Sequence, residues 1–206
     1  MSDLVGELQA LGAATLGEAG GHALRARIRP AWPGARVCGP AFCALNTPGD
    51  NLAIHVAAAE APAGSVIVAS VGDVAEIGYW GEVLTTAAEA WGIAGLVIDG
   101  GVRDVDALRD HGFGVFAAMV ALRGATKDRP GVVGGSVTVG DVEVHTGDWI
   151  IGDADGVTAI RAGELETVLA AGQARAAKES AMFAALRDGA TTIGLLGLDA
   201  DHIARH

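Results

Sequence analysis

Two short apolar segments on either side of a helical segment constrain the fold of this chain more than any other feature. "SVIVAS" (65–70) and "AGLVID" (94–99) each predict a buried strand, and "EVLTTAAEAWG" (82–92) predicts a helix that ends at a glycine. A strand, a helix and a second buried strand within 35 residues form a βαβ unit. The two strands of such a unit are parallel and their connection is right-handed, so the sequence predicts an α/β fold.

The segments on either side of this unit predict elements of both kinds. Before it, we expect a helix over 2–12, a short second helix from Thr15, a strand, turn and strand within 26–46, and a helix from Asp50-Asn51 to Pro62. Within and after it, we expect a loop over 71–81, a helix over 104–112, a strand over 113–118, hairpins over 134–160, and a long alanine-rich helix from Ala162 to about Gly189.

The length and composition of the chain favour a single domain. It has 206 residues, half of them hydrophobic, and no segment has the composition of a linker. A chain of this length buries enough apolar surface to fold without disulfides or structural metals. We therefore expect one α/β domain over residues 1–206, with a mixed βαβ core, antiparallel hairpins and a C-terminal helix, as in swivelling β/β/α folds.

The charge pattern excludes several classes of partner. The formal net charge is −11, and the basic residues form neither a run nor a stripe. We expect no nucleic-acid partner and no membrane partner, because both anionic surfaces are bound through a basic patch. The N-terminus has no basic region followed by an apolar core, and no apolar run approaches the roughly 18 residues of a membrane span. A cytoplasmic location is expected.

The two cysteines predict no redox or metal site. Cys38 and Cys43 lie five residues apart on a predicted strand, which places them on opposite faces. Their spacing differs from the CxxC pattern. We expect two buried, reduced thiols.

The residues that follow the strand "AGLVID" are the strongest candidates for a functional site. Asp99 and two glycines lead there to Arg103 and Asp104. Ligands of parallel α/β folds bind beyond the C-terminal ends of the strands, and the helix that starts near Gly81-Glu82 offers unpaired backbone N–H groups at the same place. Arg103 can hold a carboxylate through two parallel hydrogen bonds. Asp104, with Glu82 nearby, suits a hard divalent cation such as Mg²⁺, bound largely through water.

Arg103 and Asp104 also have a purely structural interpretation, in which they pair and Asp104 caps the following helix. His55 is a weaker candidate for lining a site, because it lies on the helix that begins near Asn51. The sequence "GDADG" (152–156) lacks the closing ligands of a calcium loop and predicts a hairpin turn.

The lysines exclude one mechanism. Lys127 lies in a polar turn and Lys178 lies on the C-terminal helix, and neither position predicts the dry pocket that a Schiff-base lysine needs. Carbonyl chemistry in this chain would have to rely on a metal instead.

Several longer segments match a known family. They are "RPAWPGARVCGPAFC", "TPGDNLAIH", "GSVIVAS", "WGEVLTTAAEAWGIAGLVIDGGVRD", "GDWIIGDADGV" and the closing "KES…ALRDGATTIGLLGL". Nearly end to end, the chain resembles the 4-hydroxy-4-methyl-2-oxoglutarate aldolases and the regulator of ribonuclease activity A, which share one fold. The block from Trp80 to Asp104 is the most specific part of this resemblance.

The resemblance implies a class II, divalent-metal-dependent aldolase or decarboxylase. Its substrate would be a pyruvate-derived 2-oxo acid such as 4-hydroxy-4-methyl-2-oxoglutarate or oxaloacetate. By the family's pattern, Asp104 would be the direct protein ligand of Mg²⁺ or Mn²⁺. Arg103 would bind substrate and stabilise the enolate oxygen, and Glu82 would orient a metal-bound water.

The resemblance also implies further substrate contacts and an oligomer. The amides of Gly81, Val83 and Leu84 would hold the pyruvoyl carboxylate, and Asn51 matches a position near the substrate. Glu179 matches a glutamate that reaches the site of a neighbouring subunit through water. A homotrimer or a homohexamer would follow from that contact.

One position departs from the family's pattern, and two other functions stay open. The family often has a carboxylate three residues after the aspartate of "RD", where this chain has Ala107, and Asp106 lies one residue earlier. On a helix this turns the charge by about 100°. The alternatives are a non-catalytic regulator that binds a ribonuclease, and another metal-enolate lyase or isomerase. A menaquinone methyltransferase is not supported, because no glycine-rich opening is placed to bind a methyl donor.

Overall fold

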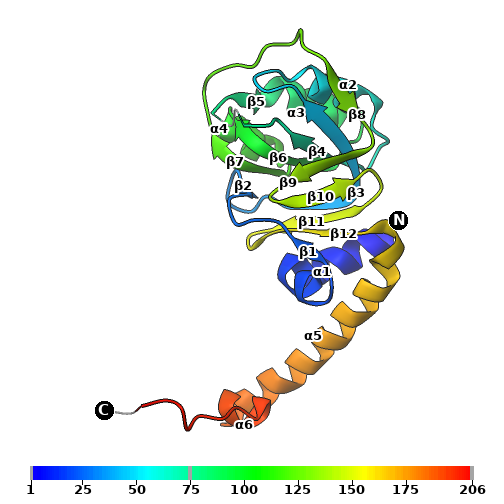
Figure 1. Ribbon diagram of the computed structural model, residues 1–206. Helices are drawn as coiled ribbons and strands as arrows, with labels where there is room; N and C mark the ends of the chain where they lie inside the picture. The colour runs from blue at the N-terminus through cyan, green and yellow to red at the C-terminus, as the bar shows by residue number, and fades with distance from the viewer. Residues whose placement is uncertain (1, 74–75, 205–206) are drawn as a thin grey trace.

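The predicted βαβ unit lies at the centre of a mixed sheet in the computed structural model, which describes residues 2–73 and 76–204 (Figure 1). The strand order is β1-β12-β11-β3-β4-β6-β7-β2, with β5 also paired to β6 and β8 to β3. Strands β3, β4, β6 and β7 are parallel neighbours, and β4 pairs with β6 from Val66↔Gly95 to Ser70↔Asp99. The predicted α/β class is therefore confirmed.

The described residues form helices and strands with the following bounds. The helices are α1 Ser2–Glu18, α2 Leu52–Glu60, α3 Glu82–Ala90, α4 Val105–His111, α5 Leu165–Arg187 and α6 Thr192–Leu196, with a 3₁₀ turn at Ala162–Glu164. The strands are β1 His22–Ala23, β2 Arg29–Pro30, β3 Val37–Asn46, β4 Val66–Ser70, β5 Gly78–Trp80, β6 Gly95–Val102, β7 Val115–Val120, β8 Gly131–Val133, β9 Ser136–Val139, β10 Val142–His145, β11 Trp149–Asp153 and β12 Gly156–Ile160.

Apolar side chains cover the parallel strands on both faces, which is why these strands are almost continuously hydrophobic. Helices α2, α3 and α4 pack on one face, around Ile54, Leu84 and Leu108. The β9–β10 hairpin packs on the other face through Val139 and Val144. The predicted antiparallel hairpins are confirmed in β9–β10 and β11–β12.

Helix α1 packs with the start of α5 against the β11–β12 hairpin, through a small core that includes Leu8, Ile151 and Val168. The backbone of α1 leaves helical geometry at Gly12, where φ is 80°. The two helices predicted before residue 20 are thus the two halves of α1. Cys38 and Cys43 are buried free thiols in different clusters, and burial raises the pKa of Cys38 to about 12.

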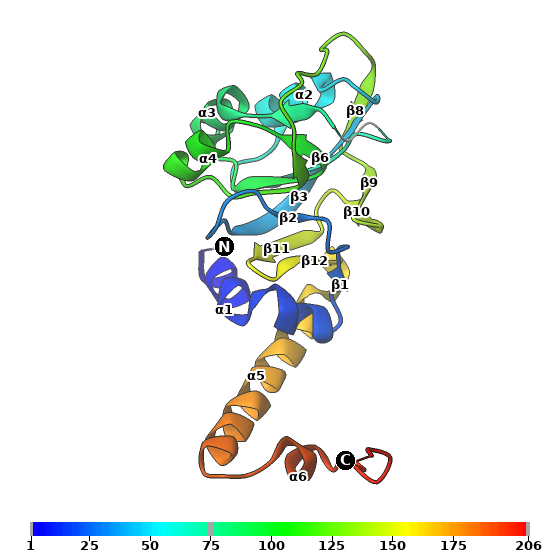
Figure 2. The same ribbon diagram turned by 90° about the vertical axis from the view of Figure 1, so that its left-hand side faces the viewer.

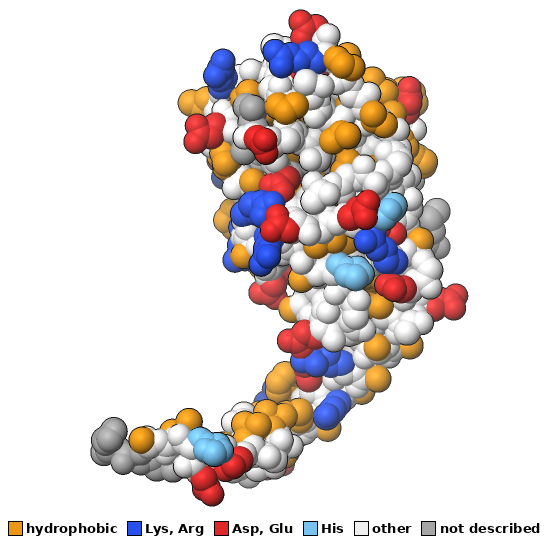
Figure 3. Space-filling view, in the orientation of Figure 1, with side chains coloured by type: hydrophobic (Ala, Val, Ile, Leu, Met, Phe, Trp, Pro, Cys, Tyr) orange, Lys and Arg blue, Asp and Glu red, His pale blue; other side chains and the backbone are white. Residues whose placement is uncertain are grey.

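The C-terminal arm, which we define as residues 173–204, carries most of α5 and all of α6 away from the sheet (Figures 1 and 2). Hydrophobic side chains of the arm are exposed: Phe183, Ile193, Leu195, Leu196, Leu198 and Ile203. Orange side chains accordingly gather on the lower part of the molecule in Figure 3. No helix in the described part of the chain combines the length and hydropathy that crossing a membrane requires.

Two local predictions around the central strands were wrong. Residues 78–80, expected to be loop, form β5 beside β6, and β6 continues to Val102 instead of ending at Asp99. Strand β6 continues because Gly100 carries no side chain: a Cβ there would lie 2.7 Å from Val71 Cγ2 and 3.3 Å from Tyr79 Cδ2. The extension places Arg103 and Asp104 directly after the last residue of a strand.

Candidate active site

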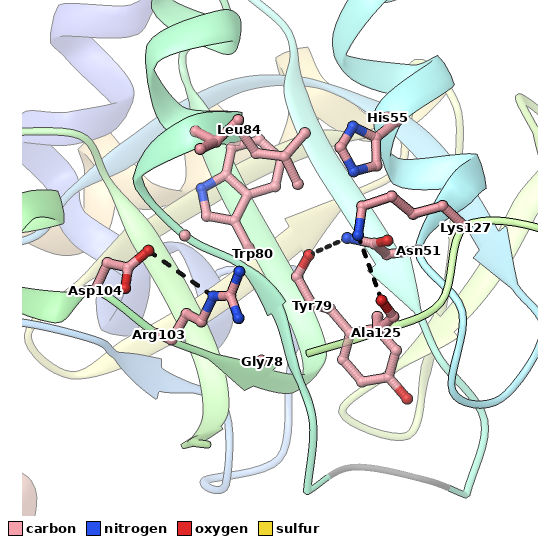
Figure 4. Close-up of a pocket in the computed structure, with 12 residues that line it drawn as sticks. Asn51, His55, Gly78, Tyr79, Trp80, Leu84, Arg103, Asp104, Ala125 and Lys127 are labelled. Atoms are coloured by element: carbon pink, nitrogen blue, oxygen red, sulfur yellow. Dashed lines mark hydrogen bonds and ion pairs between the residues drawn. The ribbon is translucent and has the colours of Figure 1, made fainter. Parts of the chain in front are cut away.

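A cavity of about 150 Å³ lies beyond the ends of β5 and β6 (Figure 4). Its walls come from the start of α2, from β5, from the start of α3, from the residues after β6, and from the loop between β7 and β8. The residues that line it are Asn51, His55, Gly78, Tyr79, Trp80, Gly81, Val83, Leu84, Arg103, Asp104, Ala125 and Lys127. The structure thus brings together all the predicted site residues except Glu82 and Glu179.

Arg103 and Asp104 are fixed by the backbone that follows β6. The amide of Arg103 donates to Trp80 O at 2.9 Å, and Asp104 has a left-handed backbone with φ 56° and ψ 38°. Such geometry is uncommon outside glycine and tends to occur at functional sites. Asp104 Oδ2 accepts a hydrogen bond from Glu82 N at 3.1 Å and lies 3.9 Å from Arg103 Nε. Asp104 therefore caps α3, whereas the structural interpretation of the sequence had it capping α4.

Two glycines leave room for these side chains. A Cβ on Gly81 would collide with Asp104 Oδ2 and lie 3.1 Å from Arg103 Cγ. A Cβ on Gly78 would collide with the carbonyl oxygen of Ala121 and lie 3.1 Å from Arg103 Cδ. The backbone of β5 and the start of α3 can approach Arg103 and Asp104 only because both positions lack a side chain.

The first turn of α3 presents amide groups beside this pair. The first hydrogen bond of the helix runs from Thr85 N to Gly81 O at 3.1 Å, so the amides of Glu82, Val83 and Leu84 have no partner within the helix. The first of these three amides, that of Glu82, donates to Asp104 Oδ2. Next to Arg103, the amides of Val83 and Leu84 therefore form a binding site for a carboxylate. The positive end of the helix dipole also favours a negative charge there.

Glu82 is not among the residues that line the cavity, and its carboxylate lies near α4. Its Oε1 lies 3.7 Å from His111 Nε2 on α4, and the side chain is 57% exposed. His111 Nδ1 also lies 2.8 Å from Glu89 Oε2. The hydrogen bond to Glu89, with a smaller contribution from Glu82, raises the pKa of His111.

The carboxylate of Asp99, which precedes the predicted site in sequence, has a structural role. Arg27 donates to both of its oxygens, at 3.0 Å and 2.7 Å, and Gly140 N donates to Oδ2 at 2.9 Å. Asp99 therefore fastens β6 to the turn between β9 and β10, away from the cavity.

The wall of the cavity opposite Arg103 carries Asn51, His55 and Lys127, which we call the far wall (Figure 4). Asn51 is buried, and its Nδ2 donates to Tyr79 O at 2.7 Å. Two buried atoms of the far wall, Asn51 Oδ1 and His55 Nε2, have no hydrogen-bond partner. Burial, followed by the nearby charge of Lys127, lowers the pKa of His55, so its ring is neutral at pH 7.

A buried carboxylate holds the loop that carries Lys127. Asp50 Oδ2 accepts hydrogen bonds from Thr126 Oγ1 at 2.7 Å, from Asp128 N at 2.8 Å and from Arg129 N at 3.2 Å. Its Oδ1 accepts from Leu52 N at 2.8 Å. Burial alone would raise the pKa of Asp50, but these hydrogen bonds lower it to about 2. No local sequence pattern identifies Lys127 individually as a lining residue, because this anchor lies far from it along the chain.

Glu179 lies on α5 and pairs with Arg175, with 2.9 Å between Glu179 Oε1 and Arg175 Nε. The arm carries it away from the cavity of its own chain (Figure 1). Its expected place in a neighbouring subunit's site stays a prediction.

One carboxylate of this chain, that of Asp104, lines the cavity. Within the described residues, no group of three or more His, Cys, Asp or Glu side chains is arranged to hold a metal ion. Mg²⁺ is commonly bound through one or two carboxylates, with water and substrate completing the shell. The donor set therefore fits a cation of this kind that is shared with water and substrate, and does not fit a site closed by protein ligands.

Residues 6–159 match the family model described as RraA-like, Aldolase/RraA. A protein from Halalkalibacterium halodurans, named "Putative 4-hydroxy-4-methyl-2-oxoglutarate aldolase", is 34% identical over 170 residues, which cover 82% of this chain and 81% of that protein.

Solved structures share the fold. An uncharacterized protein from Pseudomonas syringae pv. tomato aligns with a TM-score of 0.82 at 24% identity, over 95% of this chain and 97% of its own. The RNA-processing inhibitor RraA from Thermus thermophilis aligns with a TM-score of 0.65 at 27% identity, over 72% of this chain and 91% of its own.

Proposed function

Because the chain belongs to the RraA-like family of aldolases and RraA proteins, we propose that it is a carbon–carbon lyase that releases pyruvate from a 2-oxo acid. The observation that carries this proposal is the placement of Arg103 and Asp104 beside the free amides of α3, in one cavity. A regulator that only binds another protein needs no such arrangement.

The residues of this chain have separable roles in the proposed reaction. The amides of Val83 and Leu84 bind the carboxylate of the pyruvoyl group, and Arg103 donates to the keto oxygen. Cleavage of the bond beyond C3 leaves an enolate, so negative charge grows on that oxygen. Arg103 stabilises the charge where it develops, which lowers the barrier for retro-aldol cleavage and for decarboxylation alike.

Asp104 is the residue that would hold a divalent cation, Mg²⁺ or Mn²⁺, at this site. When bound, the cation supplies a second positive charge to the keto oxygen. We assign two further carboxylates to the water at this site. Glu82 orients a water that transfers the proton, and Glu179 of a neighbouring subunit lies in the same hydrated region. A homotrimer or homohexamer is part of the proposal for this reason.

The test is pyruvate release from 4-hydroxy-4-methyl-2-oxoglutarate and from oxaloacetate, coupled to NADH oxidation, with and without Mg²⁺ or Mn²⁺. Reactions without protein correct for spontaneous decarboxylation of oxaloacetate. Metal-dependent release that EDTA removes supports the lyase. Absence of release from both substrates, with folded protein and metal present, would contradict it and favour a protein-binding regulator.

A further inference from the structure

His111, the last residue of α4, contacts two carboxylates of the neighbouring helix α3 (Figure 2). Its Nδ1 lies 2.8 Å from Glu89 Oε2, and its Nε2 lies 3.7 Å from Glu82 Oε1. The two glutamates are separated by about two helical turns, so both lie on the face of α3 that meets α4. One imidazole ring therefore bridges two acidic side chains of one helix.

The chemistry of the imidazole ring fits this bridge. A carboxylate only accepts hydrogen bonds, so a ring nitrogen that faces a carboxylate carries a proton. Both nitrogens of His111 face a carboxylate, and an imidazolium is the form of histidine that donates from both. The charged groups against this ring are Glu89 and Glu82, and both favour its charged form.

Glu82 is held from both ends of α4. Its backbone nitrogen donates to Asp104 Oδ2 at 3.1 Å, and Asp104 immediately precedes α4. Its carboxylate lies beside His111, which ends the same helix. The first contact fixes the backbone of Glu82 next to the cavity, and the second limits the directions in which its side chain can point. The contact with His111 uses Oε1 and leaves Oε2 available to a water molecule.

We propose that His111 is a positioning residue for the reaction, which holds the carboxylate of Glu82 where that carboxylate can orient the water that transfers the proton. This inference rests on the proposed function and adds a residue to it. Glu82 is not among the residues that line the cavity, so its carboxylate acts on the substrate through water. A glutamate side chain that is free in solvent samples several rotamers, and holding it in one of them before the reaction removes an entropic cost from the barrier.

Glu89 anchors the ring that holds Glu82. It makes the shorter of the two contacts with His111, and it lies in the last turn of α3, whereas Glu82 begins that helix beside the cavity. The three side chains thus act in order: Glu89 orients His111, and His111 orients Glu82. Removing Glu89 should therefore have an effect of the same kind as removing His111, but a smaller one.

Variants of these three residues should keep the fold. The side chains of Glu82 and Glu89 are 57% and 37% exposed, and ion pairs exposed to this extent contribute little to stability. A loss of activity in such variants would therefore reflect the position of a side chain. Thermal midpoints close to that of the wild type check this point.

The first experiment tests the bridge by NMR, without turnover. The ring signals of His111, assigned with His111→Gln, are followed across pH in the wild type, Glu82→Gln and Glu89→Gln, with EDTA present. We expect both variants to lower the pKa of His111, and Glu89→Gln to lower it more. Asp106→Asn is the matched control, because that carboxylate pairs with Arg109 on the same helix, and it should leave the titration nearly unchanged. A titration that Glu82→Gln does not alter would overturn the bridge.

The second experiment measures pyruvate release with Mg²⁺. We expect His111→Leu to lower kcat by about tenfold and to change KM by less than about twofold, because substrate binding is assigned to other residues. His111→Gln keeps an N–H donor and should recover part of the loss. Glu82→Gln should lower kcat at least as much, and combining it with His111→Leu should add little, because His111 acts through Glu82. Arg109→Met is the control, since it removes a positive charge from the same helix, and it should keep the wild-type kcat.

The two experiments separate this inference from the proposed function. A wild-type kcat in His111→Leu, or losses that multiply in the double variant, would overturn the positioning role. If the wild type releases no pyruvate from either substrate, the proposed function fails, and the NMR titration still decides whether His111 holds Glu82.

Discussion

Asp104 Oδ2 lies 3.1 Å from the backbone nitrogen of Glu82, so the residue that follows β6 caps the helix that follows β5. This hydrogen bond joins the two strand ends at which the cavity opens. It also sets the orientation of a carboxylate whose backbone has a positive φ of 56°.

Asp104→Asn tests the carboxylate without disturbing this geometry. Asparagine tolerates a left-handed backbone and its side-chain oxygen can still accept from Glu82 N, so the thermal midpoint should change little. Without the negative charge, we expect metal-dependent pyruvate release to fall by at least about 10²-fold and Mn²⁺ binding to weaken. Coupled assays and calorimetry give the two readouts. Turnover close to that of the wild type would remove Asp104 from the mechanism.

Gly81→Ala should damage the site more than the fold. The added Cβ meets Asp104 Oδ2, so the carboxylate has to shift. We expect a stability loss of about 1–3 kcal/mol in urea unfolding and a much larger fractional loss of activity. Gly6→Ala is the control, because a Cβ there meets nothing within 4 Å and lies on the α1 helix. If Gly81→Ala keeps full activity, the close approach of α3 to Asp104 has no functional meaning.

Asp50→Asn should loosen the far wall and change the pH dependence of stability. The pKa of Asp50 is about 2 in the folded protein, below its ordinary value of 3.8, so its contribution is complete above pH 4 and is lost as the pH falls toward 2. At pH 7 we expect the variant to lose roughly 2–3 kcal/mol of unfolding free energy, and the difference from wild type to shrink between pH 5 and pH 2.

Urea unfolding at several pH values measures this difference. Asp128→Asn is the control, since that exposed side chain lies on the same loop and only its backbone contacts Asp50. A difference between Asp50→Asn and wild type that stayed constant over this pH range would contradict the assignment.

A mixing experiment tests whether the site is shared between subunits. Asp104→Asn and Glu179→Gln should each be nearly inactive. If each site combines Asp104 of one subunit with Glu179 of another, co-refolding equal amounts should restore about a quarter of the wild-type activity, the chance that both residues of a site are intact. Light scattering should show a trimer or hexamer. Absence of any recovery from a correctly assembled mixture would place Glu179 outside the site.

The near side of the cavity could be predicted from the sequence because its residues are local. Arg103 and Asp104 lie shortly after the apolar strand predicted at 94–99, and Gly81 directly precedes a helix, so one βαβ rule places both at the same edge of the sheet. The same pattern could not show that β6 extends past Asp99, because the glycines that allow it have no side chains to carry a periodicity. Nor did it show that Asp99 pairs with Arg27, 72 residues earlier.

Of the far wall, the sequence indicated Asn51 and His55 but not Lys127, whose position depends on contacts that are distant in sequence. Lys127 lies in a segment whose composition indicates a polar turn, and it is indeed exposed. Its place at the cavity depends on Asp50, which is 76 residues away from Thr126. Neither periodicity nor a local motif encodes a pairing of this kind.

The anchoring of that loop by Asp50 has a consequence for the order of folding. The near side of the cavity is assembled from a single βαβ unit and the residue pair after it, whereas the far wall requires α2 and the loop after β7 to meet across a long stretch of chain. Contacts between residues that are far apart in sequence tend to form late in folding. Closing the intervening loop costs conformational entropy before the contact contributes any stabilising free energy. A partly folded chain would therefore form the side of the cavity that carries Arg103 and the α3 amides before the side that carries Lys127.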